Sequence, residues 1–291
     1  MSNMSELRQH LYAIEQTRQI TNAMYLLSTS RMKKAMQNID FNILYMKRLR
    51  STVKDILSKT KHCEIHNRFI DEQNEGRVLF LVITSDKGLC GGYNSDIVKL
   101  TSEKISEFEN PILVSIGSIG SDMFINNGIT PDYTFYDILQ HPSLYMANKI
   151  AENIINLYRK HQVRQTYIIF TEYESSAVQT AVCKRILPLL RRDFLDLEYE
   201  LKYTAEPLFE PSVDAVFDNV VSAYLSGYLY DVFMQCSASE NSARMTAMQN
   251  ATENADKMIA GLSSQINAQR QLAITNEIIE IAAATNIEGA V

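Results

Sequence analysis

The chain has 291 residues, enough for one large domain or two small ones. Hydrophobic residues make up 46% and charged residues 21%, an ordinary globular composition that predicts a buried core. The formal net charge of -6 argues against a bulk role in binding nucleic acid or a polybasic membrane surface. The cysteines are widely spaced, which favours free thiols in a reducing cytosol over a disulfide framework or a four-cysteine zinc site. They are Cys63, Cys90, Cys183 and Cys236.

The N-terminus is polar within a few residues of its start, unlike the apolar core of a signal peptide. No stretch reaches 18 uncharged apolar residues, so we expect no direct membrane insertion. A soluble protein that docks onto a membrane complex stays compatible with this pattern.

The placement of glycine and proline predicts a long helix at each end. The first glycine is Gly76 and the first proline Pro111, whereas after Pro211 only Gly227 and Gly261 interrupt the chain before Gly289. Proline costs about 3 kcal/mol in a helix interior and glycine about 1 kcal/mol. We therefore predict one helical segment over residues 1–60 and another over residues 212–291.

The first helix is expected from about Asn3 to about Lys59, roughly 85 Å at 1.5 Å per residue. Its apolar residues recur at helical spacing, which predicts one buried stripe. The stripe comprises Leu7, Leu11, Ile14, Ile20, Met24, Leu27, Met32, Met36 and Ile39.

The last helix is expected from Ser212, a capping residue, to about Thr285, roughly 110 Å. Its stripe includes Ile259, Leu262, Ile266, Ala273, Ile278 and Ile281. Two such helices must bury their stripes on each other or on a partner, and an antiparallel coiled coil does so. Arg18 and Gln269 fall on or near the seam, so the coil is expected to be loose or short.

Between the helices, residues 76–206 predict a doubly wound, Rossmann-like α/β domain with a mainly parallel sheet. Residues 77–83, 112–116 and 167–170 are apolar runs typical of strands buried on both faces. Helical patterns cover residues 94–108, 118–126 and 143–160, and residues 177–187 suggest an edge strand. Alternating strands and helices favour this class of fold.

Two segments invite a chemical interpretation. Residues 88–92, GLCGG, follow the first strand where phosphate-binding loops lie, yet they match no phosphate motif. A tight turn that needs positive φ angles explains them as well. His62, Cys63, Glu64 and His66 have metal-ligand types but no structural zinc spacing, so we predict a solvated helix end and no metal site.

Cys90 has no histidine near it in the sequence to act as a base, so we do not expect it to be a catalytic nucleophile. We expect no cofactor.

Two surfaces suggest partner contacts instead. Seven basic residues and one acidic residue lie between positions 31 and 54, which indicates either a solvated face or a strip for an acidic partner. The basic residues are Arg31, Lys33, Lys34, Lys47, Arg48, Arg50 and Lys54. Residues 278–284, IIEIAAA, are apolar nearly all round and must be covered, by a partner or by the chain itself.

Four motifs resemble the gamma subunit of F-type ATP synthases. They are residues 20–24 with 31–35 (ITNAM and RMKKA), 84–94 (TSDKGLCGGYN), 239–252 (SENSARMTAM, then NAT) and 270–278 (RQLAITNEI). They occur in family order and at family spacing across essentially the whole chain. The chain departs from the family at Asn22, where lysine is usual, and at residues 25–29.

The resemblance implies a non-catalytic rotor shaft that couples ion flow to ATP synthesis or hydrolysis. The coiled coil would sit in the α3β3 ring of alpha and beta subunits, and the insert would join the epsilon subunit and the membrane c-ring. The protein would be peripheral, on the cytoplasmic face of the cell membrane. The resemblance implies ring contacts at Met24, Arg31, Lys33, Lys34, Cys90, Arg244, Gln271, Thr275, Glu277, Ile278 and Ile281. A coiled-coil scaffold and a nucleotide-binding α/β protein are the alternatives.

Overall fold

The computed structural model describes residues 4–59, 67–160, 162–175, 179–194 and 209–288. Two long helices, α1 (Met4–Lys59) and α5 (Val213–Glu288), flank an inserted sheet. The chain divides into two compact units. We call residues 1–28 with 244–291 the helical unit, and residues 29–243 the α/β unit.

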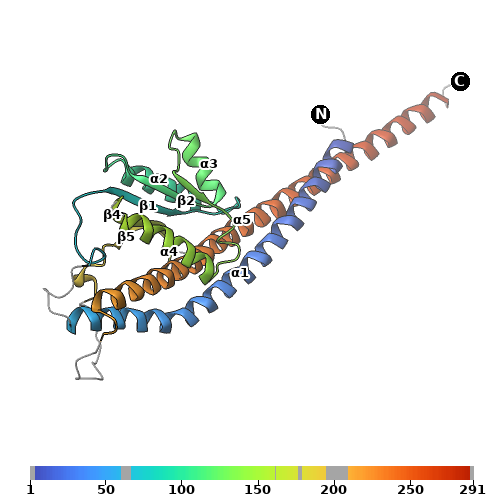
Figure 1. The fold of residues 1–291 in the computed structure, drawn as a ribbon. Coiled ribbons are helices and arrows are strands. Elements are labelled where there is room, and N and C mark those ends of the chain that lie inside the picture. Colours follow the sequence, from blue (N-terminus) through green and yellow to red (C-terminus); the bar gives the residue numbers. More distant parts are fainter. Residues whose placement is uncertain (1–3, 60–66, 161, 176–178, 195–208, 289–291) are drawn as a thin grey trace. The chain divides into compact units, whose positions relative to one another are not determined.

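The sheet has five strands in the order β3-β2-β1-β4-β5 (Figure 1). The strands are β1 (Arg77–Ile83), β2 (Ile112–Ile116), β3 (Tyr133–Phe135), β4 (Val163–Tyr173) and β5 (Gln179–Leu187). β1 pairs in parallel with β2 and β4, β2 pairs in parallel with β3, and β5 pairs antiparallel with β4. The predicted mainly parallel sheet is confirmed, with β3 as a strand that the sequence did not predict.

Side chains of β1 alternate between two hydrophobic layers, because successive residues of a strand point to opposite faces. Val78, Phe80 and Val82 pack with α2 (Tyr93–Ile105) and α3 (Ser118–Asn126). Leu79, Leu81 and Ile83 pack with α4 (Leu144–Arg159) and with turns of α1 and α5. Within the α/β unit, Figure 1 shows α2 and α3 on one side of the sheet. The terminal helices therefore form part of the core that covers the other side.

α5 begins as the sequence predicts. The Ser212 hydroxyl accepts a hydrogen bond from the Ala215 amide at 3.3 Å, and Asp214 lies in the first turn. A side-chain cap and an early carboxylate both satisfy the unpaired amides of a helix start.

Within the helical unit, α1 and α5 run antiparallel along a repeat of seven residues. Leu7, Ile14, Thr21 and Ser28 are buried on α1, and Met248 and Ala255 on α5. A repeat of seven is the signature of a coiled coil, so the predicted coil is confirmed. Its predicted stripe is partly wrong, because Ile20, Leu27 and Met36 are exposed. The true seam of the helical unit passes through the small polar residues Thr21 and Ser28.

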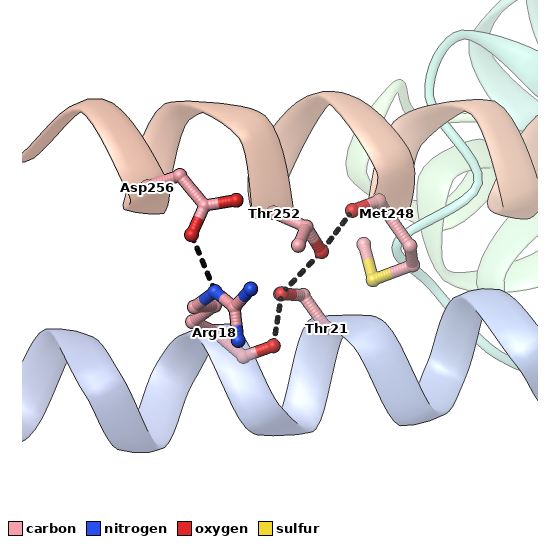
Figure 2. Close-up of polar contacts among 5 residues, drawn as sticks. All are labelled: Arg18, Thr21, Met248, Thr252 and Asp256. Carbon is pink, nitrogen blue, oxygen red and sulfur yellow. Dashed lines mark hydrogen bonds and ion pairs between the residues drawn. The ribbon is translucent and has the colours of Figure 1, made fainter. Parts of the chain in front are cut away.

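Polar contacts link the two helices at this seam (Figure 2). The hydroxyls of Thr21 and Thr252 lie 2.8 Å apart, and beside them Arg18 forms an ion pair with Asp256. Thr21 also contacts the Arg18 carbonyl, and Thr252 the Met248 carbonyl. The two hydroxyl groups have two hydrogens for three contacts. Thr21 and Thr252 therefore cannot donate to each other and to both backbone carbonyls at the same time.

Replacing Thr21 or Thr252 with valine is expected to lower the free energy of unfolding by about 1 kcal/mol, the usual contribution of one hydrogen bond. The double variant should lose about as much as one single variant, because both remove the same bond. Urea denaturation followed by circular dichroism measures all three. Thr17→Val is the control, because Thr17 is exposed on the same helix and bonds the Ala13 carbonyl of its own helix at 2.9 Å. Fully additive losses from the two single changes would contradict the coupling.

The two glycines inside α5 have opposite surroundings. A Cβ at Gly227 would lie 2.9 Å from Met46 Sδ and 3.0 Å from Tyr45 Cε1, whereas a Cβ at Gly261 meets no atom within 4 Å. Gly261→Ala should therefore gain about 1 kcal/mol of helix stability. Gly227→Ala should lose about 1 kcal/mol, because overpacking outweighs that gain. Urea denaturation of the isolated chain tests both, and equal gains would show that Tyr45 and Met46 move aside freely.

Candidate partner-contact surfaces

The glycine-rich loop after β1 is held together by its own polar side chains. Asn94 accepts a hydrogen bond from the Ser85 amide at 2.9 Å and donates to Ser85 Oγ at 2.7 Å and Cys90 Sγ at 3.4 Å. Leu89 and Gly91 have φ angles of 61° and 59°. The predicted tight turn with positive φ angles is therefore confirmed. The side chains of the loop motif stabilise the loop by hydrogen bonding to one another.

The crevice where doubly wound folds bind ligands is filled by the chain itself. Such ligands lie beyond the carboxyl ends of the strands where the strand order reverses, here at β1 and β4. Ser239 of α5 donates to the Thr171 carbonyl of β4 at 3.3 Å. Tyr93, which follows the β1 loop, lies beside Cys236 and Glu240 of α5. The last turns of α5 in the α/β unit thus occupy the usual nucleotide position.

Burial suppresses acid–base chemistry where α5 covers the ends of β1 and β4. It raises the pKa of the Cys236 thiol and raises the pKa of the Tyr93 hydroxyl well above its usual value. Both groups therefore stay protonated at neutral pH. Cys90 is 2% exposed and its sulfur contacts Asn94, so it is not placed to attack a substrate.

Cys90 and Arg244 are buried in this structure, whereas the resemblance implies that they contact the ring. Arg244 is 6% exposed, and Met24 is half-buried on α1. Arg244 lies within α5, and Cys90 lies in the loop after β1. Contact of these two residues with a partner stays a prediction.

The basic strip on α1 is largely a surface. Arg31, Lys33, Lys34, Lys47 and Arg48 are exposed, whereas Lys54 is half-buried. Arg50 is also half-buried and donates to the Asp193 carbonyl at 3.4 Å. The first five residues are therefore available to an acidic partner, and the last two are partly covered within the α/β unit.

The C-terminal turns of α5 are exposed on every side. Each residue from Arg270 to Ile281 is exposed, including Gln271, Thr275 and Glu277. Ile278, Ile279 and Ile281 are 61%, 59% and 60% exposed. Within the helical unit, α5 continues past the N-terminal end of α1 (Figure 1). The structure therefore excludes burial of these isoleucines by the described part of the chain, and the side chains of residues 282–284 lie outside the described residues.

The structure adds a polar cluster that the sequence did not reveal. Asp231 of α5 accepts hydrogen bonds from Asn42 of α1 at 3.4 Å and Gln235 at 2.8 Å. Burial raises the pKa of the Asp231 carboxyl. No sequence signal marks this pair, because its members are 189 residues apart.

Metal and membrane sites find no support in the described residues. No group of three or more histidine, cysteine or acidic side chains is placed there to hold a metal ion. The cluster at His62, Cys63, Glu64 and His66 lies outside the described residues. No described helix combines the length and apolar character that crossing a bilayer requires.

The fold defines a class of protein. Its long terminal helices run antiparallel, they flank an inserted α/β sheet, and α5 fills the crevice where related sheets bind ligands. The sequence model of the family described as ATP synthase matches residues 3–286. The ATP synthase gamma chain of Ruminiclostridium cellulolyticum is 36% identical over 292 residues, covering 96% of this chain and 97% of that relative. The Acetivibrio thermocellus gamma chain is 34% identical over 290 residues, covering 97% of each chain. The chain therefore belongs to the ATP synthase gamma chain family.

Solved structures share the fold. A chain in a cryo-EM structure of the Euglena gracilis mitochondrial ATP synthase (OSCP/F1/c-ring, rotational state 3) has a TM-score of 0.67. It is 17% identical, and the match covers 99% of this chain and 95% of that one. A chain of the Tetrahymena thermophila mitochondrial central stalk and c-ring has a TM-score of 0.59 at 23% identity, covering 80% and 99%.

Proposed function

We propose that the chain is the central rotor shaft of an F-type ATP synthase and couples ion flow through the membrane sector to ATP synthesis or hydrolysis. Its partners are the alpha and beta subunits of the α3β3 ring, the epsilon subunit and the membrane c-ring. The catalytic sites belong to the partners, and this chain contributes no catalytic residue. The exposed apolar end of α5, in a chain that matches the family over residues 3–286, carries the proposal.

The end of α5 is suited to act as a bearing. Contacts of Ile278 and Ile281 with an apolar inner surface of the α3β3 ring would be non-directional, so they would change little as the shaft turns. Gln271, Thr275 and Glu277 are exposed on the same turns and offer directional contacts that favour discrete stops. A rotor needs both kinds of contact, because it must slide and also pause.

The basic strip supplies a second contact with the ring. Arg31 and Lys34 are exposed and lie three positions apart, where like charges on a helix repel each other. An acidic surface on a beta subunit would relieve that repulsion, and Lys33 would join the same contact. Met24 lies half-buried in the helical unit and contributes apolar packing there.

Cys90 and Arg244 have a different role in this proposal. Both are buried, so they support the surfaces that meet the ring. Hydrogen bonds around Cys90 hold the loop after β1 in place. Lys87 of that loop is exposed, and within the α/β unit it lines a pocket with residues of α1 and α5.

The attachment of this subunit to the membrane is indirect. The α/β unit would join the epsilon subunit and the c-ring, which places the chain on the cytoplasmic face of the cell membrane as a peripheral subunit. This location follows from the proposed partners, not from any membrane-spanning helix.

Two other functions explain less. A nucleotide-binding α/β protein needs an open crevice at β1 and β4, where α5 lies instead. A scaffold coiled coil explains the paired helices but not the exposed apolar end of α5. A nucleotide titration would detect the first, and the second predicts homodimers of the isolated chain.

Co-purification from membranes with a tagged chain tests the proposal. The expected product is a complex with ATPase activity that holds one copy of this chain with three alpha and three beta subunits, read by native mass. Recovery of the chain alone, or as a homodimer without ATPase partners, would overturn the proposal.

A further inference from the structure

The α/β unit has an open cavity, lined by both polar and apolar side chains, to which the proposed shaft function assigns no ligand. Its volume is about 330 Å³. Its walls come from α1, the loop after β1, the segment that precedes α4, and α5. A water molecule fills about 30 Å³ of liquid, so the cavity has room for a small polyatomic ion with some of its water.

Positive groups gather in this cavity from three of its walls. Arg31 and Lys34 come from α1, Lys87 from the loop after β1, and His141 from the segment before α4. One carboxylate, Glu240 of α5, also lines the cavity and is 7% exposed. Three permanent cations against one anion leave an excess of positive charge, which favours an anionic ligand.

The start of α4 adds donors to the same cavity. Ser143 lines it and caps the helix by accepting a hydrogen bond from the Met146 amide at 3.3 Å. Its hydroxyl hydrogen is therefore left to point elsewhere. α4 has 16 residues, and the N-terminus of such a helix carries a partial positive charge. This end of α4 reinforces the preference that the cations establish.

One polar residue in the wall has a buried acceptor. Asn241 is 5% exposed and lines the cavity, and its amide nitrogen donates to the Ser237 carbonyl at 2.8 Å. Its Oδ1 is buried and meets no hydrogen-bond donor among the described residues. A buried acceptor without a donor costs about 1–3 kcal/mol. Because this oxygen is buried, the cations and not Asn241 determine which ligand the cavity favours.

We propose that the cavity binds a phosphate-class oxyanion, namely inorganic phosphate in its monohydrogen form. Its charged oxygens meet Arg31, Lys34, Lys87 and His141. Sulfate has the same shape and charge, so it is expected to compete for the same cations. One chain supplies all the residues of the site, and two of them, Arg31 and Lys34, are also proposed to meet a beta subunit in the assembled ring.

Binding of inorganic phosphate to the full isolated chain, measured by isothermal titration calorimetry at constant ionic strength, tests the proposal. The expected result is saturable binding of one phosphate, with which sulfate competes. Arg31→Ala with Lys34→Ala should raise the Kd about tenfold or more, because hydrogen bonds to charged groups are lost. Lys47→Ala with Arg48→Ala is the matched control, because it removes the same charge from exposed positions of the same helix outside the cavity. The control should keep the Kd within about twofold.

Further variants keep the test decisive. His141→Ala removes one exposed cavity group from a different segment and should also weaken phosphate binding, whatever the folding of the double variant. Circular dichroism checks that each variant is folded. Absence of saturable binding, or equal losses in the cavity and control variants, would each overturn the proposal. The isolated chain avoids the phosphate sites of an assembled ATP synthase, so failure of this site says nothing against the shaft function.

Discussion

Replacing Ile278 and Ile281 with aspartate is expected to weaken assembly of the chain with its alpha and beta partners by about a hundredfold. Both side chains are about 60% exposed in the chain by itself, at 61% and 60%. Full burial of an isoleucine side chain contributes about 1.5–3 kcal/mol, so covering the exposed parts of two in the ring supplies about 3 kcal/mol. Aspartate loses that contribution and adds the cost of burying a charge. Titration of the labelled chain into reconstituted alpha and beta subunits, read by native mass, measures the change.

The same double variant should leave the isolated chain almost unchanged in stability, because exposed substitutions usually alter it by no more than about 0.5 kcal/mol. This separates an effect on assembly from an effect on folding. Ile125→Asp is the control, because Ile125 is 56% exposed on α3 of the α/β unit. It introduces the same chemistry at a matched exposure and should not affect assembly. Normal assembly of the Ile278 and Ile281 variant would contradict the bearing role of α5.

Strongly local signals in the sequence predicted most of the fold. Residues 77–83 and 112–116 are strands with the predicted bounds, because a buried parallel strand is apolar on both faces and stands out from its neighbours. The helix expected to end near Lys59 does end there, and the cap at Ser212 forms. These features depend on nearby residues, so a single sequence contains them.

The features that the sequence did not predict depend on distant residues. β3 has only three residues, none of them buried, and it exists because β2 offers it an edge. The seam of the helical unit follows Thr21 and Ser28 instead of the larger Ile20 and Leu27. Small polar side chains fill a close helix pair when a hydroxyl on the facing helix satisfies them, as Thr252 does for Thr21. An apolar pattern on one helix cannot reveal that partner.

The sequence likewise predicted some features of the candidate site and not others. Exposure of Arg31, Lys33 and Lys34 and of the end of α5 agrees with surfaces read from charge and apolar patterns. Burial of Cys90 could not be predicted from these patterns. The loop motif suggested a contact with a partner, whereas its side chains bond to one another. The position of α5 over β1 and β4 could not be predicted from either segment alone. It also explains why a glycine-rich loop after a first strand does not form a nucleotide site here.

Replacing Gly117 with alanine is expected to lower the stability of the α/β unit by about 4 kcal/mol, the largest effect of any change proposed on the fold. Gly117 lies between β2 and α3 with a φ angle of 97°, a conformation that residues with a Cβ rarely adopt. A Cβ there would lie 2.3 Å from the backbone oxygen of Thr84. That oxygen cannot move aside, because the Thr84 amide is bonded to the Ile116 carbonyl at 2.8 Å and β1 lies in the centre of the sheet.

Gly128→Ala is the control that separates strain from overlap. Gly128 follows α3 with a φ angle of 77°, and a Cβ there would meet no atom within 4 Å. It should cost only the strain of the positive φ, about 1–2 kcal/mol. Urea denaturation followed by circular dichroism gives both values. A loss for Gly117→Ala no larger than that for Gly128→Ala would show that the Thr84 backbone yields to the new methyl group. A larger loss is expected, because Gly117→Ala adds the overlap with Thr84 to the strain of the positive φ angle.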